Sequence, residues 1–560
     1  MDLRHPFLTE QLIAYIGNKR ALLPFLHGVF SQLAPEPSGA TFLDPFAGSG
    51  AVSRLARMMG FTVAANDLEH YSFVINSCHL GESRSDLDVL FREQGGLESV
   101  LAELNNLPPP REAAAYISRH YAPRRTEEAD WRTERLFYTQ ENARVIDAVR
   151  ERIEGLYPGT PQEETRFREK MTLLAPLLYE AATHTNTSGV FKACHRGFGG
   201  HSRDALKRIM AGIVIRPPVL VDAPTRSAVA CMDAGEFLSG RSADICYLDP
   251  PYAVHQYGSN YFMLNSIALW DKPPVSEERG PDGRLRSKAG IRADWTMTRS
   301  DFCYPSTALS EMKRIVQAAD CRWLVVSYSD EGLIGLEELC ELLASTGSLS
   351  LRSTGYVKYP GGKQSPGRTT RNQELALVVD RRAGARGGGP RRSGPVSELL
   401  LGVRMARLMG QAFDPARVRR VFHTEGDSIL LQPCPGQTVR LPMQHLWRFA
   451  ADSVPPGFGA PADAERFVTA LRGCLVRDVR QEINVIVAIA RKEKDARERD
   501  RLLKEVLRLA NKLAHRKYAA VCAEALEGLR VFASSDPSLA AFRAGLDRIA
   551  LTASRRGAAG

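Results

Sequence analysis

Residues 41–67 read TFLDPFAGSGAVSRLARMMGFTVAAND and predict a strand, a glycine-rich turn, a helix and a second strand. The apolar run at 41–44 predicts the first strand, and the one-sided apolar pattern of 51–60 predicts a helix that stops at Gly60. Residues 61–67 predict the second strand. Such a unit is typical of an open α/β sheet.

The same alternation returns later in the chain. Apolar runs at 244–249, 322–329 and 374–380 predict further strands, with helical patterns between them. We therefore predict an α/β fold in which helices cover both faces of an open sheet.

Two segments interrupt this alternation. Residues 81–225 are polar and largely helical, and Val145, Val149 and Ile153 recur there at helical spacing, which predicts an inserted domain. Residues 381–397 contain five arginines, five glycines and no acid, which is typical of a flexible linker. The predicted domains are 1–80 and 226–380 for the sheet, 81–225 for the insert, 381–397 for the linker and 398–560 for a mainly helical accessory domain.

The accessory domain has its own patterns. Residues 419–432 predict a hairpin, and the charge run at 490–501 is interpreted as a solvated helix face. An apolar stripe at 3–4 spacing predicts a helix that needs an apolar partner; it consists of Leu502, Val506, Leu509 and Leu513.

Composition limits the class of protein. The chain has 560 residues, 44% of them hydrophobic and 25% charged, which predicts a soluble globular protein of several domains. It lacks a run of 18 apolar residues and an apolar signal core, so we expect no membrane span and a cytoplasmic location. Ten scattered cysteines without zinc spacing predict reduced packing thiols and no metal. The net charge of +10 agrees with a polyanionic partner, although it is also common in Arg/Ala-rich proteins.

Several side chains near the predicted strand ends suit a nucleotide-like ligand. Gly48 and Gly50 allow close approach to the backbone, and Asp67 ends the second strand, where an acid can accept both ribose hydroxyls. Lys19, with Tyr15 four residues before it, can pair with a ligand carboxylate. Taken alone, Asp67 also suits a turn residue and Lys19 a solvated lysine.

The stretch ADICYLDPPY at 243–252 raises a second chemical possibility. Asp249 follows a strand, and the two prolines hold the backbone while leaving the Pro250 carbonyl as an acceptor. Two acceptors in one pocket suit an exocyclic amine, and Tyr252 offers a face on which a base can stack. Asp233 is a further acid that can accept from an adenine amino group.

In this order, the motifs resemble the Dam-like DNA adenine-N6 methyltransferases over roughly residues 10–380. The resemblance is carried by Tyr15-Ile-Gly17-Asn-Lys19, Asp44-Pro-Phe46-Ala-Gly48-Ser-Gly50, Asp67 and Asp249-Pro250-Pro251-Tyr252. The lysine motif reads GNK where the family commonly has GGK, and FAGSG agrees with the usual F-x-G-x-G.

The resemblance implies a Rossmann-like methyltransferase fold with S-adenosyl-L-methionine as cofactor. It places the cofactor at the glycine turn, with its ribose at Asp67 and with the lysine motif, Asp44 and Phe46 nearby. It implies that Asp249, Pro250, Pro251 and Tyr252 hold a flipped-out adenine of double-stranded DNA. A restriction-modification or phage-defence role follows, with a cognate endonuclease as a further partner.

Two basic segments and one further stretch extend this expectation. Residues 284–302 and 352–371 interleave Arg and Lys with aromatic residues, which suits DNA contact, although surface loops have the same composition. Residues 184–200 look like the family's region near the flipped base. RNA guanine-N2 methylation, protein glutamine methylation and a non-catalytic DNA-binding protein are the alternatives. The large insert and the N-terminal lysine motif favour DNA.

Overall fold

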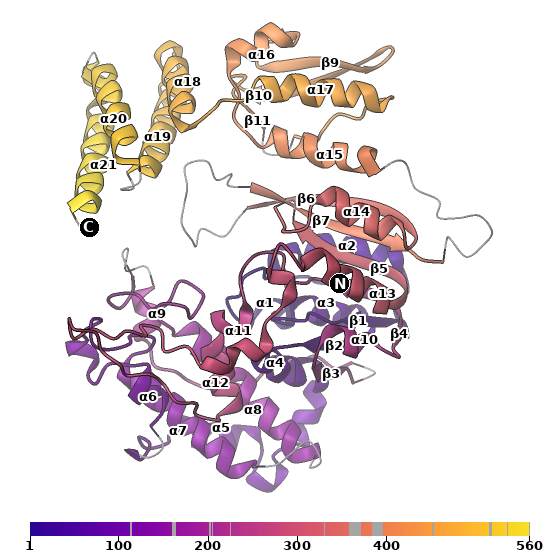
Figure 1. The fold of residues 1–560 in the computed structure, drawn as a ribbon, viewed down its shortest axis with the longest axis vertical. Helices are drawn as coiled ribbons and strands as arrows, with labels where there is room; N and C mark the ends of the chain where they lie inside the picture. Colours follow the sequence, from indigo (N-terminus) through magenta and orange to yellow (C-terminus); the bar gives the residue numbers. More distant parts are fainter. Residues whose placement is uncertain are drawn as a thin grey trace. The chain divides into compact units, whose positions relative to one another are not determined.

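The computed structural model describes residues 1–112, 115–158, 164–200, 203, 205–223, 226–329, 331–357, 371–382, 396–450, 453–514, 518–534 and 536–558. The chain divides into two compact units (Figure 1). The first unit is Met1–Thr354 with Leu375–Ser393, and the second is Gly355–Glu374 with Gly394–Gly560. Most of the predicted linker, and residues 358–370 of the predicted basic segment, lie outside the described residues.

A seven-stranded sheet organises the first unit, with strand order β3-β2-β1-β4-β5-β7-β6 (Figure 1). The strands are β1 (Thr41–Asp44), β2 (Thr62–Asp67), β3 (Ala228–Cys231), β4 (Ser242–Leu248), β5 (Asp320–Ser329), β6 (Ser348–Val357) and β7 (Arg371–Asp380). The five strands from β3 to β5 pair in parallel, so their carboxyl ends meet at one edge of the sheet. The fold is mixed α/β with a mostly parallel sheet, as predicted.

The unit at 41–67 folds as predicted. Strand β1 leads into helix α3 (Ala51–Met59), which ends at Gly60 with φ +100°. Strand β6 was not predicted, because it lies at the edge of the sheet and Leu349 is its one buried side chain among residues 348–354. An edge strand carries little apolar alternation for a sequence pattern to detect.

Helices surround the sheet and form the insert. Around the sheet lie α1 (Pro6–Thr9), α2 (Leu23–Leu33), α4 (His70–Gly81), α10 (Ala234–Leu238), α13 (Ala308–Ala318) and α14 (Leu336–Ala344). The insert contains α5 (Leu97–Asn105), α6 (Ile117–His120), α7 (Gln140–Leu156), α8 (Glu164–Thr183) and α9 (Leu206–Met210). Two helices follow strand β4, namely α11 (Tyr257–Asn260) and α12 (Phe262–Leu269).

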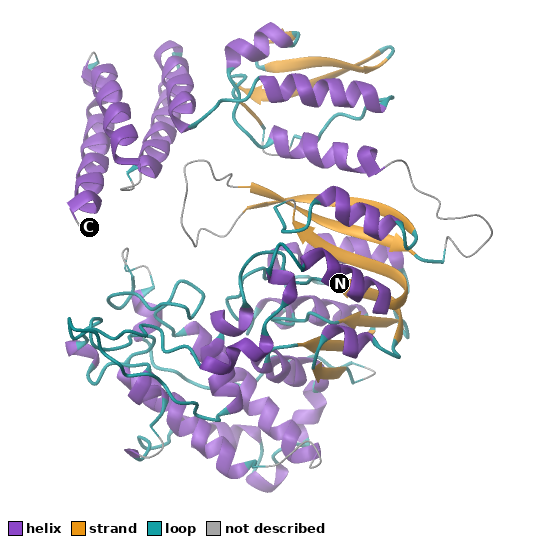
Figure 2. Cartoon of the chain, viewed as in Figure 1, coloured by secondary structure: helices purple, strands orange, loops and turns teal. Residues whose placement is uncertain are grey.

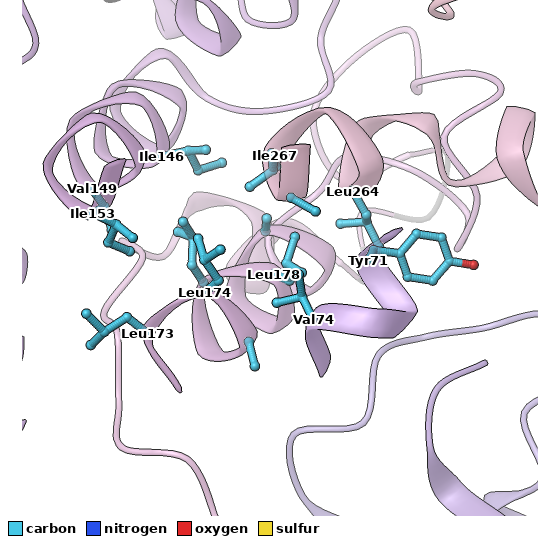
Figure 3. Packing of buried hydrophobic residues seen from close by; sticks show 14 of the residues in the cluster. Tyr71, Val74, Ile146, Val149, Ile153, Leu173, Leu174, Leu178, Leu264 and Ile267 are labelled. Carbon is cyan, nitrogen blue, oxygen red and sulfur yellow. The ribbon is translucent and has the colours of Figure 1, made fainter. Parts of the chain in front are cut away.

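The insert shares a hydrophobic core with α4 and α12 of the first unit (Figure 3). The apolar face of α7 runs through Ile146, Val149 and Ile153, whereas the predicted Val145 is only partly buried. These side chains pack in one cluster with residues of α8, with Val74 of α4 and with Ile267 of α12. The predicted boundaries at 80 and 225 therefore do not coincide with a break in packing.

The second unit contains two hydrophobic clusters. The first joins α15 (Val396–Met409), α16 (Pro415–Val421) and α17 (Pro461–Gly473) to a sheet of order β11-β10-β9-β8. Its strands are β8 (Thr424–Glu425), β9 (Ser428–Cys434), β10 (Gln437–Gln444) and β11 (Arg448–Phe449). The second cluster is formed mainly by α18 (Val479–Lys492), α19 (Ala496–Leu513), α20 (Ala519–Ser534) and α21 (Ala540–Ala558).

The predicted features of the accessory domain are partly confirmed. The stripe from Leu502 to Leu513 is buried, and β8 pairs with β9 as a hairpin. Residues 415–421 form α16 instead of extending that hairpin. The charge run at 490–501 is not one helix face, because α18 ends at Lys492 and Asp495 caps the start of α19.

Two general observations concern the whole chain. All ten cysteines are free thiols, seven of them buried, as predicted. Among the described residues, no helix combines the length and apolar character needed to cross a membrane.

Candidate active site

The segments that follow β1, β2 and β4 meet at a cavity of about 450 Å³. They converge because the carboxyl ends of parallel strands lie at one edge of the sheet, where open α/β sheets bind ligands. Twelve of the thirteen predicted site residues line this cavity: Tyr15, Gly17, Lys19, Asp44, Phe46, Gly48, Asp67, Asp233, Asp249, Pro250, Pro251 and Tyr252. The thirteenth, Gly50, lies behind the wall.

The two glycines of the turn have different surroundings. Gly48 has φ +52°, and a Cβ atom there would lie 2.9 Å from Cε1 of Tyr15. Gly50 has φ +78°, and its Cβ would lie 2.3 Å from Oδ1 of Asn76 in α4. Gly48 thus lets an aromatic ring lie against the turn, whereas Gly50 allows the start of α3 to pack on α4.

Asp67 holds the glycine turn from the end of β2. Its Oδ2 accepts the Gly48 N–H at 2.7 Å, and its Oδ1 accepts the Glu69 N–H at 2.9 Å. Burial raises the pKa of Asp67, and these two backbone hydrogen bonds oppose the shift. Each carboxylate oxygen has a second lone pair, so Asp67 can still accept from a ligand in the cavity.

Two more carboxylates beside the turn have pKa values raised to about 7. Oδ2 of Asp44 accepts the Ser53 hydroxyl at 2.6 Å, and burial raises the pKa of Asp44 to about 7. Oε2 of Glu69 accepts from Nδ2 of Asn265 at 2.5 Å, and burial raises the pKa of Glu69 to about 7. Sequence reasoning missed Glu69, which stands two residues after Asp67 and lines the same cavity.

Lys19 and Asp249 form an ion pair in the wall of the same cavity. The Lys19 side chain is 4% exposed, and its Nζ lies 3.1 Å from Oδ1 of Asp249. The same Nζ lies 3.5 Å from the Tyr252 hydroxyl and 4.9 Å from the centre of that ring. Burial raises the pKa of Asp249, and the lysine opposes this shift, which favours the ionised carboxylate.

Tyr15 stands in a group of tyrosines that ties the lysine motif to the segment after DPPY. Its ring stacks on Tyr261 at 5.0 Å and contacts Tyr257 at 5.1 Å. The Tyr261 hydroxyl accepts the Ile16 N–H at 2.7 Å, and the Tyr257 hydroxyl donates to the Ile16 carbonyl at 3.1 Å. Tyr15 and Ile16 are therefore positioned by Tyr257 of α11 and by Tyr261 between α11 and α12, which the sequence did not indicate.

Asp233 faces the cavity but already has several partners. It caps α10 by accepting the backbone N–H groups of Gly235 and Glu236 at 2.9 and 3.2 Å. Arg314 donates to both of its oxygens at 2.9 and 2.8 Å, and its hydrogen bond lowers the pKa of Asp233. The sequence did not indicate Arg314, which comes from α13 and also lines the cavity.

The end of the predicted basic segment 284–302 also lies at the cavity. Residues 298–302 line it, and the ring of Phe302 meets the edge or face of Phe46 in a T-shaped contact at 5.5 Å. Altogether seven carboxylates and three cationic side chains line the cavity, an excess of acid that suits a cationic ligand. Among the described residues, no three His, Cys, Asp or Glu side chains group as a metal site requires.

Comparison with known proteins adds independent information. The family described as D12 class N6 adenine-specific DNA methyltransferase matches residues 15–284. The Type II methyltransferase M.NlaIII of Neisseria lactamica is 31% identical over 353 residues, which cover 62% of this chain and 93% of that protein. For M.CviAII of Paramecium bursaria Chlorella virus 1 the identity is 29% over 353 residues, covering 62% and 92%.

A longer relative matches over a similar part of this chain. The modification methylase StsI of Streptococcus sanguinis is 26% identical over 373 residues, which cover 66% of this chain and 52% of that protein. No solved structure matches the chain.

Proposed function

Because the chain belongs to the D12 class N6 adenine-specific DNA methyltransferase family, we propose that the cavity binds S-adenosyl-L-methionine beside a flipped-out adenine. The observation that carries this proposal is the buried Lys19–Asp249 pair, which lines the same cavity as the glycine turn and Asp67. Family membership favours DNA over the RNA-base, protein and non-catalytic alternatives.

The residues around the turn suit the cofactor. S-Adenosyl-L-methionine supplies an electrophilic methyl group on a positively charged sulfur. Asp67 would accept hydrogen bonds from the ribose hydroxyls. A nearby cation would stabilise the ionised forms of Asp44 and Glu69, which burial disfavours. Phe46 and Gly17 would add apolar and backbone contacts, and Asp233 would mark the adenine end of the site.

Asp249 and the Pro250 carbonyl would act on the substrate amine. Adenine N6 is a weak nucleophile because its lone pair is delocalised into the ring. Two acceptors that take both N6 hydrogens favour a more tetrahedral, electron-rich nitrogen and aim it at the methyl group. Once N6 has accepted the methyl group, it would lose one proton, and the Asp249 carboxylate or water would take up that proton.

Lys19 and Tyr252 would support this step. Lys19 opposes the rise in the pKa of Asp249 that burial causes, and so would favour the ionised carboxylate that accepts N–H bonds. Tyr252 would stack on the flipped base. Its backbone carbonyl accepts the Leu333 N–H at 3.1 Å and its ring contacts that of Tyr328, and both interactions fix its position. Pro251 holds the backbone between them.

The insert and the wider context complete the proposal. We assign sequence reading to residues 81–225, because the sheet itself offers only a base pocket and base contacts carry the specificity. We expect the enzyme to act on double-stranded DNA in the cytoplasm, paired with a cognate restriction endonuclease.

Expression in a host that lacks adenine methylation tests the function directly. Long-read sequencing of the host DNA should reveal N6-methyladenine at one short motif, and Asp249→Asn should abolish it. Methylation of RNA but not DNA by the purified protein would overturn the proposal. Exchange of residues 81–225 with those of a relative should move the motif, and an active chimera with an unchanged motif would exclude the insert as the reader.

A further inference from the structure

Three arginines from distant parts of the chain surround one tryptophan in the insert region. The guanidinium carbons of Arg196, Arg132 and Arg284 lie 4.6, 5.0 and 5.7 Å from the ring of Trp131. All three arginines are exposed and Trp131 is half-buried. The group, which we call the Trp131 cluster, thus places three positive charges around a single indole.

The backbone around the Trp131 cluster is firmly held. The Leu285 N–H donates to the Arg132 carbonyl at 3.3 Å, and the buried Arg135 donates to the Ser287 carbonyl at 2.8 Å. On the third segment, buried Asn186 accepts the Gly199 N–H at 3.2 Å and donates to the Leu136 carbonyl at 2.9 Å. These bonds join loops at 130–136, 186–199 and 276–290 into one surface.

The chemistry of this surface suits an anion. An arginine stacked on indole uses its flat face and leaves the N–H groups in its plane available to donate. Asp130 and Asp282 lie 3.4 and 3.5 Å from Arg132 and Arg284, but no carboxylate of the described residues lies within 4.0 Å of Arg196. Residues 130–135, 192–196 and 276–292 together contain nine Lys and Arg against five Asp and Glu.

The same loops lead to the cavity. The segment that carries Arg284 continues to residues 298–302 in the cavity wall. The loop that carries Arg196 also carries Lys192, whose charge adds to the effect of burial in lowering the pKa of His255, three residues after Tyr252. Figure 2 shows that this part of the first unit is rich in loops, which are frequent sites of binding residues.

We propose that the Trp131 cluster binds the phosphate backbone of duplex DNA next to the flipped-out adenine. Arg196 and Arg284 donate to phosphate oxygens, and Trp131 holds both guanidinium groups in place. The contact adds affinity without reading sequence, because the phosphate backbone is the same at every site. This inference rests on the action of the protein on DNA proposed above.

The test compares full-length variants on two duplex oligonucleotides, one with the methylated motif and one without it. The double variant Arg196→Gln/Arg284→Gln should weaken binding to both duplexes by a similar factor, about tenfold or more. The slope of log affinity against log salt should fall by about 1–2, since about 0.9 counterions are released per phosphate contact. Trp131→Phe should remove most of the change in tryptophan fluorescence on adding DNA.

Arg241→Gln is the matched control, because Arg241 also stacks on an aromatic ring, that of Phe237 at 4.7 Å, but directly precedes the amino end of β4. It should leave both affinities and the salt slope unchanged. Unchanged slope and affinity in the double variant would overturn the proposal. So would a change of methylated motif, which would make the cluster a base reader, or a parallel loss of cofactor affinity, which would indicate damage to the cavity. If the proposed function is wrong, the unsubstituted protein will not methylate DNA. Its DNA affinity, and therefore the effect of the double variant on that affinity, can still be measured.

Discussion

Opposite electrostatic environments surround two carboxylates at the cavity of the first unit and one carboxylate of the second unit. In the first unit, burial raises the pKa of Asp44 and of Glu69 to about 7 at the cavity wall. In the second unit, a hydrogen bond from Arg501, assisted by His445, lowers the pKa of Glu498 to about 2. A carboxylate paired with arginine is already stabilised in its ionised form. A buried carboxylate with a pKa near 7 has no such pairing with arginine, so a cationic ligand would stabilise its ionised form. The cavity of the first unit therefore suits a cationic ligand, whereas Glu498 of the second unit is already paired with Arg501 of the same helix.

Net charge divides in the same way. Residues 394–560 contain 27 Lys and Arg against 18 Asp and Glu, a net charge of +9, whereas residues 1–393 contain 47 against 46. The excess positive charge of the protein therefore does not belong to the part that holds the candidate active site. A basic accessory unit can add DNA affinity that does not depend on sequence.

The largest expected effect is on chemistry in the first unit. Asp249→Ala removes the proposed N6 acceptor and the carboxylate that forms the ion pair with Lys19, so turnover should fall by at least about a hundredfold. Cofactor affinity should change much less. Asp320→Asn, an exposed acid at the start of β5, is the control and should retain full activity in a methylation assay. Near-normal turnover of Asp249→Ala would remove this residue from the mechanism.

The second prediction concerns the cofactor. Asp67→Ala should weaken S-adenosyl-L-methionine binding by about 1–3 kcal/mol, the cost of unpaired buried polar groups. Part of that loss would come from the Gly48 N–H, which donates to Asp67. Asp67→Asn keeps an acceptor for that N–H. Its cofactor affinity, measured by calorimetry, should lie between those of the unsubstituted protein and of Asp67→Ala. Unchanged affinity in Asp67→Ala would reduce Asp67 to a turn residue.

The third prediction tests the charge comparison. A chain that ends after Arg382 keeps Arg381, which donates to the Val316 carbonyl at 2.5 Å, and loses the basic residues 394–560. DNA affinity at low salt should fall by about tenfold, and the salt dependence should become weaker. Cofactor affinity and the methylated motif should stay the same. A folded, cofactor-binding truncation that fails to methylate at any DNA concentration would place the second unit within the catalytic machinery.

The smallest expected effect is on pH dependence. Because burial raises the pKa of Asp44 from 3.8 and that of Glu69 from 4.5 to about 7, the stability of the ligand-free fold should fall as pH rises from these unfolded values toward 7 and should level off above 7. A cationic cofactor favours the ionised forms, so its affinity should rise severalfold from pH 6 to pH 8. Asp44→Asn and Glu69→Gln should each flatten that rise in calorimetry. An identical pH profile in the double variant would exclude both groups.

Local pattern was enough to predict the frame of the site. The β1–α3–β2 unit follows from apolar periodicity and from glycines at positions of positive φ, all within 27 residues. The acids at strand ends could be placed together for the same reason, because parallel strands bring their carboxyl ends to one edge. The cavity is lined by Asp44, Asp67 and Asp249, as those rules predict.

Contacts between distant segments decided the rest. The partners of Gly50, Tyr15 and Asp233 are Asn76, Tyr261 and Arg314, and no local spacing links these pairs. The insert looked separable because a helical pattern reports which face is buried but not what buries it; α4 and α12 do so in the folded chain. The surroundings of Trp131 could not be predicted for the same reason, because two of the three arginines around it come from segments 65 and 153 residues away. Periodicity and motif order are properties of the chain itself, whereas burial and pairing arise only when packing brings remote side chains within a few ångströms.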